Sequence, residues 1–195
     1  MEIIIDVETT GIPSKRNAHF KELEVYDSAR VVSIAWIILD GNRRIDQQYH
    51  VIKPKQFIIP EGAIKVHGIT NEFAHQVGIP MEKCIKYLRE TFAKHNIVRF
   101  VAHNVPFDFN IILSELHRHG HANDMISRFF RIERYCTMKN GRQHLQVSKF
   151  PKLSDLYTNL TNRTFEGAHN AAADVEACCV VFKILRQKQR RLSVQ

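Results

Sequence analysis

IIIDVETTG, residues 3–11, is a run of β-branched residues that leads into two acids and ends in a glycine. Three isoleucines in succession favour a buried β-strand. Asp6 and Glu8 are two residues apart, so an extended chain points both side chains the same way. Like charges repel, and burying unpaired carboxylates costs free energy. We therefore expect a positive group between these two acids.

The composition is that of a globular protein. Of the 195 residues, 44% are hydrophobic and 25% are charged, which fits one domain with a full core. No apolar window of about 18 residues or more is present, so no membrane span is expected. The N-terminal strand, broken by Asp6, does not have the form of a signal peptide.

The cysteines and the net charge indicate where the protein acts and on what. The four cysteines show no CxxC spacing and favour buried thiols in a reducing, intracellular compartment, in the cytoplasm or with nucleic acid. A total of 28 Lys and Arg against 20 Asp and Glu gives a net charge of +8. Such a balance favours a polyanion partner, most simply nucleic acid.

Strands precede helices along the chain. A strand over 30–39, a turn over 40–44 and a second strand over 45–53 predict a hairpin beside the central first strand. Further strands are expected at 97–104 and 134–138, and helices at 60–70, 70–78, 80–96, from 107, 152–160 and 170–187. This order predicts an α/β fold with a mixed five-stranded sheet flanked by helices. In such sheets, sites form at the strand ends.

Four acids occupy positions of that kind. Asp6 and Glu8 end the first strand, Asp108 follows the strand over 97–104 and opens a helix, and Asp174 lies in the first turns of the last helix. The alanines at 171–173 allow that helix to approach the sheet closely. All-oxygen donor sets suit Mg²⁺ or Mn²⁺ and not zinc. Two such ions about 3.5–4 Å apart clamp both oxygens of a phosphodiester displacement.

Three motifs carry a family resemblance: DVETTG at 6–11, HNVPFD at 103–108 and HNAAAD at 169–174. Together they resemble the DEDDh 3′–5′ exonucleases, the family of the proofreading epsilon subunit of bacterial DNA polymerase III, which has an RNase H-like fold. The resemblance spans residues 1–186, which we expect to form the exonuclease domain, with 187–195 as a short basic tail.

The resemblance implies roles for the acids and one histidine. Asp6, Glu8 and Asp174 would hold the catalytic metal, with Asp6 bridging to a second ion at which Asp108 acts. His169 would be the general base, for which an ordinary pKa near ~6.5 is suitable. The other branch of the family has tyrosine where this chain has Asn170, so the chain resembles the histidine branch.

The same resemblance suggests residues that contact the substrate. Thr10 and Gly11 would meet the 3′-terminal nucleotide, and glycine permits close approach. Phe107 either supports the terminal base or packs in the core. The other candidates are Glu61 and His67 at the rim, and His103 and Asn104, which could instead satisfy backbone groups.

The expected function is a metal-dependent 3′–5′ exonuclease that uses two divalent cations, Mg²⁺ or Mn²⁺. It would release nucleoside monophosphates from single-stranded or frayed 3′ ends of DNA. An RNA-trimming member of the same family and a catalytically silent nucleic-acid-binding module remain alternatives. A DNA polymerase or another replication protein is a candidate partner. Because no long C-terminal region follows residue 186, we expect independent action or association through the domain surface.

Overall fold

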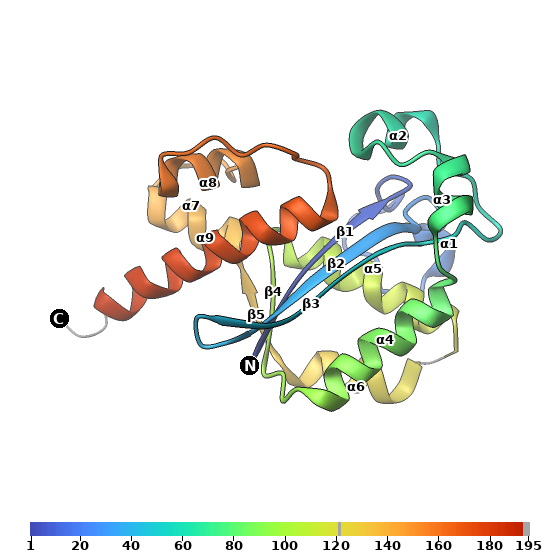
Figure 1. The fold of residues 1–195 in the computed structure, drawn as a ribbon, viewed down its shortest axis with the longest axis horizontal. Coiled ribbons are helices and arrows are strands. Elements are labelled where there is room, and N and C mark those ends of the chain that lie inside the picture. Colours follow the sequence, from blue (N-terminus) through green and yellow to red (C-terminus); the bar gives the residue numbers. More distant parts are fainter. Residues whose placement is uncertain (121, 193–195) are drawn as a thin grey trace.

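The computed structural model describes residues 1–120 and 122–192. Its centre is a five-stranded sheet in the order β3-β2-β1-β4-β5 (Figure 1). β1 pairs antiparallel with β2 and parallel with β4, which pairs parallel with β5. The strands are β1 (Glu2–Thr9), β2 (Val31–Asp40), β3 (Arg43–Val51), β4 (Arg99–Ala102) and β5 (Glu133–Cys136). The predicted mixed sheet with a central first strand is confirmed.

The hairpin between β2 and β3 is tighter than predicted. Asp40 pairs with Arg43, so only two residues form the turn instead of the expected five. Gly41 has φ of 61°, a left-handed conformation that two-residue hairpin turns require. The two arginines expected in the turn therefore belong to β3.

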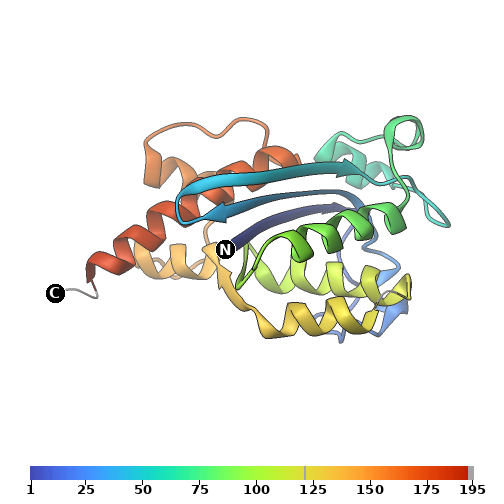
Figure 2. The same cartoon turned by 60° about the horizontal axis from the view of Figure 1, so that its bottom comes forward.

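Helices cover both faces of this sheet (Figures 1 and 2). On one face lie α4 (Met81–Lys94), α5 (Val105–Arg118) and α6 (Ala122–Arg131), and on the other lies α9 (Ala171–Leu192), with α7 (Thr137–Leu145) and α8 (Leu153–Thr161) beside it. The remaining helices are α1 (Leu23–Tyr26), α2 (Glu61–His67) and α3 (Asn71–Val77). α1, α6 and α7 are additional to the predicted helices.

The last helix is longer than predicted. α9 continues to Leu192, so residues 187–192 of the expected basic tail are helical, and residues 193–195 lie outside the described residues. In the described part of the chain, no helix is long and apolar enough to cross a membrane.

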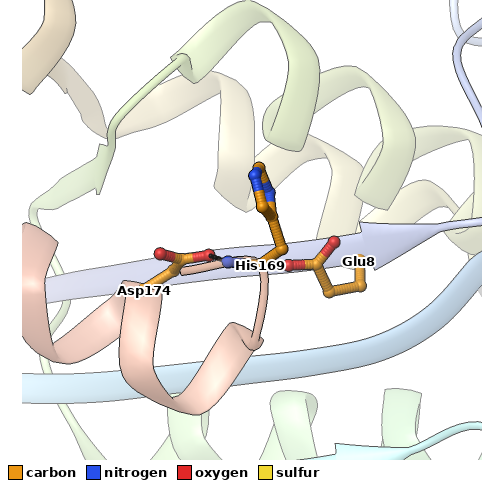
Figure 3. Close-up of side chains that lie close together, drawn as sticks. All are labelled: Glu8, His169 and Asp174. Carbon is orange, nitrogen blue, oxygen red and sulfur yellow. Dashed lines mark hydrogen bonds between the residues drawn. The ribbon is translucent and has the colours of Figure 1, made fainter. Parts of the chain in front are cut away.

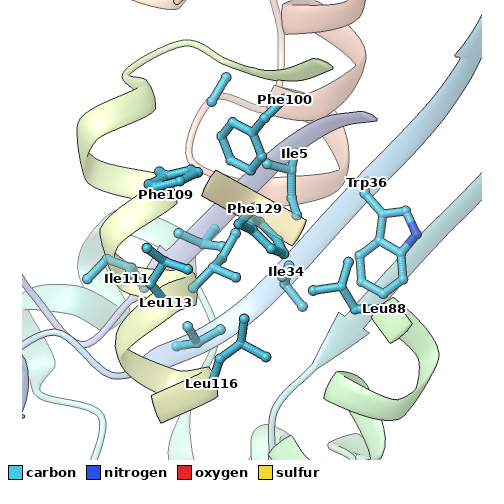
Figure 4. Close-up of a cluster of buried hydrophobic side chains, with 14 of the residues drawn as sticks. Ile5, Ile34, Trp36, Leu88, Phe100, Phe109, Ile111, Leu113, Leu116 and Phe129 are labelled. Atoms are coloured by element: carbon cyan, nitrogen blue, oxygen red, sulfur yellow. The ribbon is translucent and has the colours of Figure 1, made fainter. Parts of the chain in front are cut away.

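Alternation along β1 assigns its residues to the two faces. Ile3, Ile5 and Val7 pack in the cluster that contains the buried side chains of α4, α5 and α6 (Figure 4). Ile4 packs instead with Val175, Phe182 and other residues of α9. Side chains two residues apart share a face, so the carboxylates that follow Ile4 along β1 point to the side of the sheet where α9 lies.

Candidate active site

Two further acids meet β1 at its C-terminal end. Asp108 lies in the first turn of α5 and is 4% exposed. Its Oδ1 accepts a hydrogen bond from the backbone N–H of Val7 at 3.3 Å, which places it directly beside Asp6 and Glu8. Asp174 lies in the first turn of α9, on the face to which Asp6 and Glu8 point. The four predicted acids therefore converge from β1, α5 and α9.

The entry to α9 positions His169. Asn170 caps the helix, because its Oδ1 accepts from the N–H groups of Ala172 at 3.0 Å and Ala173 at 3.3 Å. His169 itself has φ of 67°, a left-handed conformation that is strained for a residue with a side chain. Its backbone N–H donates to Asp174 Oδ2 at 2.9 Å, which holds this turn in place.

Glu8, His169 and Asp174 form a compact set (Figure 3). One potential ligand atom from each lies within 4.8 Å of the other two. The imidazole is exposed while the two carboxylates are partly or largely buried, so His169 stands at the open side of the acids. This is the position that a base acting on a water at the carboxylates needs.

The electrostatics of the acids show that they are mutually repulsive. Burial and the charges of Asp108, Asp174 and Glu8 raise the pKa of Asp6 well above its ordinary value. Burial is also the main cause that raises the pKa of Asp108 to about 8, of Glu8 to about 7 and of Asp174 to about 6. Without a cation, at least some of these carboxyls hold protons near neutral pH.

This donor set fits divalent cations. It consists of carboxylate oxygens with one imidazole, and no cysteine belongs to it in the described part of the chain. A bound cation would offset the cost of burying these carboxylates and the repulsion among them, and would thereby lower these pKa values. Asp6, Glu8, Asp108 and Asp174 are the residues that would hold it.

The acids line an open hollow with two adjoining lobes, which share Val7, Glu8, Phe107 and His169. The first lobe, about 440 Å³, contains the acids, His103 and Asn104. The second lobe, about 540 Å³, contains Thr10, Gly11 and His67. Volumes of this size accommodate a ligand as large as a nucleotide.

The predicted contacts of the second lobe differ in what they offer a ligand. The Thr10 hydroxyl donates to the Ser28 carbonyl at 3.1 Å and accepts from the Arg30 N–H at 2.9 Å, so it is largely engaged within the protein. A Cβ on Gly11 would lie 2.9 Å from the Ser28 oxygen, which explains the glycine. His67 Nδ1 accepts from the Ile69 N–H at 3.1 Å, and burial lowers the pKa of His67.

His103 lines the first lobe, but both of its ring nitrogens bond within the protein. Nε2 donates to the carbonyl of Pro151 at 3.1 Å, and Nδ1 lies 3.1 Å from the hydroxyl of Thr137. Burial lowers the pKa of His103, which fits a neutral ring that donates on one side and accepts on the other. Asn104 is exposed in the same lobe, and its carbonyl accepts from the N–H groups at the start of α5.

Glu61 is the one predicted contact that the structure places outside both lobes. It is exposed at the start of α2, while its neighbours Pro60 and Gly62 line the second lobe. Phe107 lines both lobes and also packs against the core, so its two predicted roles are compatible.

Several other residues line the hollow that were not predicted to contact a ligand. The first lobe is completed by Lys152, Leu153, Ser154, Phe165 and Ala168, and the second by Thr9, Ile12, Pro60, Gly62, Ala63 and Val66. These residues reach the hollow through the packing of α2, α8 and the loop before α9. The Pro-Glu-Gly sequence at 60–62, where α2 begins, is the signal that could have identified part of the second lobe.

The sequence matches the family model RNase_T, described as exonuclease, over residues 3–182. It is 29% identical over 177 residues to DNA polymerase III subunit epsilon of Buchnera aphidicola subsp. Acyrthosiphon pisum, a match covering 88% of this chain and 67% of that protein. It is 25% identical over 193 residues to the 3′–5′ exonuclease DinG of Bacillus subtilis, covering 97% of this chain and 18% of that protein.

The fold is similar to that of E. coli Exonuclease I, whose structure was solved in complex with a dT13 oligonucleotide. The TM-score is 0.76 at 21% identity, over 97% of this chain and 42% of the other. This chain therefore spans less than half of Exonuclease I and less than a fifth of DinG.

Proposed function

The chain belongs to the exonuclease family, and from this premise we propose that it is a metal-dependent 3′–5′ exonuclease that acts on single-stranded or frayed DNA ends. The observation that carries the proposal is the convergence of four acids beside His169 in a nucleotide-sized hollow. Family members named for 3′–5′ exonuclease activity support the direction. The DNA in the Exonuclease I complex and the name of the epsilon subunit support DNA as the substrate.

The roles of the residues follow from their places. Asp6, Glu8, Asp108 and Asp174 would hold two divalent cations, Mg²⁺ or Mn²⁺. Such ions, when bound, polarise the phosphodiester and make water more acidic. His169, exposed beside Glu8 and Asp174, would take the proton of the attacking water.

The second lobe would hold the 3′-terminal nucleotide. Gly11 lines that lobe, and its lack of a Cβ allows the backbone to pass close to Ser28. Phe107, shared by both lobes, would lie beside the scissile nucleotide. Residues 1–186 would form the exonuclease domain.

The proposal includes the compartment and a partner of the protein. The four cysteines are free and buried, which fits an intracellular compartment where the protein meets nucleic acid. The resemblance to the epsilon subunit supports a DNA polymerase as a partner to test.

The test uses matched single-stranded DNA and RNA oligomers, labelled at either end and incubated with Mn²⁺ or with EDTA. Wild type is expected to give a ladder that shortens from the 3′ end of DNA only when metal is present. His169→Ala should slow the reaction, because the group that would take the proton of the attacking water is removed. A faster reaction on RNA would favour the RNA-trimming alternative, and binding without turnover would favour the silent module.

A further inference from the structure

Residues 134–154 contain five Lys and Arg and no Asp or Glu, in a chain that has 20 acids in total. We name Arg134, Lys139, Arg142, Lys149 and Lys152 the basic strip. All five side chains are exposed, and none forms an ion pair with any residue that the structure describes. Elsewhere on the surface, cations such as Lys86 and Arg99 pair with acids. The basic strip is therefore a concentrated positive surface without internal counterions.

The basic strip reaches the catalytic hollow at Lys152. Lys152 lines the first lobe, beside the acids. Two residues earlier, Phe150 lines a neighbouring open hollow together with Lys139 and Arg142. The same loop thus borders both hollows and leads from one to the other.

His103 fixes this loop to the site. Its Nε2 donates to the carbonyl of Pro151, the residue between Phe150 and Lys152. Its other ring nitrogen bonds to Thr137 at the start of α7, the helix that carries Lys139 and Arg142. His103, which follows β4 and lines the first lobe, is therefore bonded both to the loop that carries Lys152 and to the first residue of the helix that carries Lys139 and Arg142.

Phe150 gives the surface an aromatic element. It is 48% exposed, and the guanidinium carbon of Arg142 lies 4.4 Å from the centre of its ring. Exposed aromatic rings among cations are the usual platform for unpaired bases, since bases in a duplex are already stacked. An acidic protein bound to this surface would pair with the cations, but its binding would not require an exposed aromatic ring.

We propose that the basic strip binds the single-stranded nucleic acid that leads into the catalytic hollow. Its cations contact phosphates on the 5′ side of the terminal nucleotide, and Phe150 stacks on an unpaired base. The inference rests on the proposed function and names the part of the substrate that lies outside the reacting nucleotide.

The experiment compares a dinucleotide, which fits the hollow alone, with a strand of about twelve nucleotides, which also reaches the basic strip. Turnover of both is measured in Mn²⁺, and binding of the long strand is measured by fluorescence anisotropy in EDTA over a salt series. The variants are Arg142→Ala/Lys149→Ala and Phe150→Ala, with Phe150→Tyr as the conservative replacement.

Two control variants match these changes on other elements. Lys83→Ala/Lys86→Ala removes two exposed cations from α4, which packs on the opposite face of the sheet. Phe73→Ala removes a ring that is 46% exposed on α3, close to the 48% of Phe150. Melting curves establish that every variant folds.

Loss of the two cations should raise KM for the long strand and reduce the slope of log K against log salt by about 1.4, since each phosphate contact on a single strand contributes about 0.7. Phe150→Ala should weaken binding of the long strand by about 5- to 150-fold, the range of base–aromatic stacking. Phe150→Tyr should retain binding, and dinucleotide turnover should not change in any of the three.

Unchanged binding and salt slope in the double variant would overturn the inference. An equal loss of dinucleotide turnover would also overturn it, because the residues would then act in the hollow itself. If wild type hydrolyses neither substrate, the proposed function fails instead. The two failures are thus distinguishable.

Discussion

Compared with wild type, the Glu8→Gln variant should be more stable without metal and less stable in Mn²⁺. Burial and the charge of Asp174 raise the pKa of Glu8 to about 7. Above that pH the wild-type carboxylate is ionised, and the charge of Asp174 repels it unless a bound cation offsets the repulsion. Gln has the same shape without the charge, so it removes the repulsion and also one of the proposed metal ligands.

The magnitude follows from the pKa. The difference between the ordinary value of 4.5 and about 7 corresponds to an upper value of about 3.4 kcal/mol, at 1.36 kcal/mol per pKa unit. Because the Glu8 side chain is only partly buried, solvent screening reduces this to about 1–2 kcal/mol. In a protein of this size, that raises Tm by about 2–8 °C.

The pH dependence has a defined sign. A folded-state pKa above the unfolded value means that the destabilisation is absent below about pH 4.5 and is complete above about pH 7. The higher Tm of Glu8→Gln in EDTA should therefore be seen near pH 8 and should disappear near pH 4.5. Millimolar Mn²⁺ should reverse the order, since a ligand at about 100 times its Kd stabilises the native state by about 2.7 kcal/mol.

The assay is differential scanning calorimetry in EDTA and in Mn²⁺ at both pH values. Glu90→Gln is the control, because Glu90 is exposed on α4 and pairs with Lys86. It should change Tm little under any condition. An equal or lower Tm for Glu8→Gln in EDTA near pH 8, or a Tm of wild type that does not respond to Mn²⁺, would show that Glu8 is not a destabilising carboxylate of a cation site.

Three other substitutions test the surroundings of the site. In the wild-type protein, Arg30 Nε lies 2.7 Å from Glu115 Oε1. Glu115→Gln leaves this buried guanidinium without its ion partner and should lower the unfolding free energy, measured by urea titration, by about 3–5 kcal/mol. Because hydrogen bonds from His119 and Arg30, together with the charge of Arg30, outweigh the effect of burial and lower the pKa of Glu115 to about 2, that difference should shrink as the pH falls from about 4.5 to 2. Gly11→Ala places a Cβ 2.9 Å from the Ser28 oxygen and should cost about 1–3 kcal/mol and raise KM, whereas unaltered stability and KM would contradict the close approach. His103→Ala leaves the Pro151 carbonyl without its side-chain partner, whereas the Thr137 hydroxyl keeps its contacts with the Ala102 carbonyl and Cys178 Sγ. The substitution should cost about 1–3 kcal/mol, with a smaller loss expected for His103→Gln.

The sequence predicted the sheet because its strands carry strong local signals. Three isoleucines in β1 and the long apolar run of β2 are buried on both faces, and the buried cysteines of α9 follow its apolar pattern. The carboxylates of Asp6 and Glu8 were predicted to share a side because alternation along a strand is fixed by backbone geometry. The convergence of the acids then followed from the topology.

The missed helices have physical reasons. α7 contains Gly141, which disfavours a helix locally, but a Cβ there would lie 2.4 Å from Leu156, so glycine is needed for α8 to approach. In α6, Met125 and Phe129 lie one helical turn apart and are fully buried, a spacing that predicts the helix once both residues are considered. The tertiary contact in α7 has no counterpart in the local sequence.

The internal bonds of the site were likewise unpredictable. The ring of His103 bonds to Pro151, 48 residues away, and the Thr10 hydroxyl bonds near Ser28 and Arg30. Motif spacing places these side chains at the hollow but does not specify which of their polar atoms are already used. Only the folded arrangement of the loops determines that.

If the four acids hold the cations for hydrolysis of nucleic acid from its 3′ end, removal of one acid and blocking of the 3′ end should each stop the reaction. The most direct measurement follows single-stranded DNA blocked at either terminus by an inverted nucleotide, with wild type and Asp6→Asn, in Mn²⁺. We expect wild type to degrade the 5′-blocked strand and to leave the 3′-blocked strand intact. Asp6→Asn, while folded, should degrade neither strand. Degradation of the 3′-blocked strand, or full activity of Asp6→Asn, would contradict it.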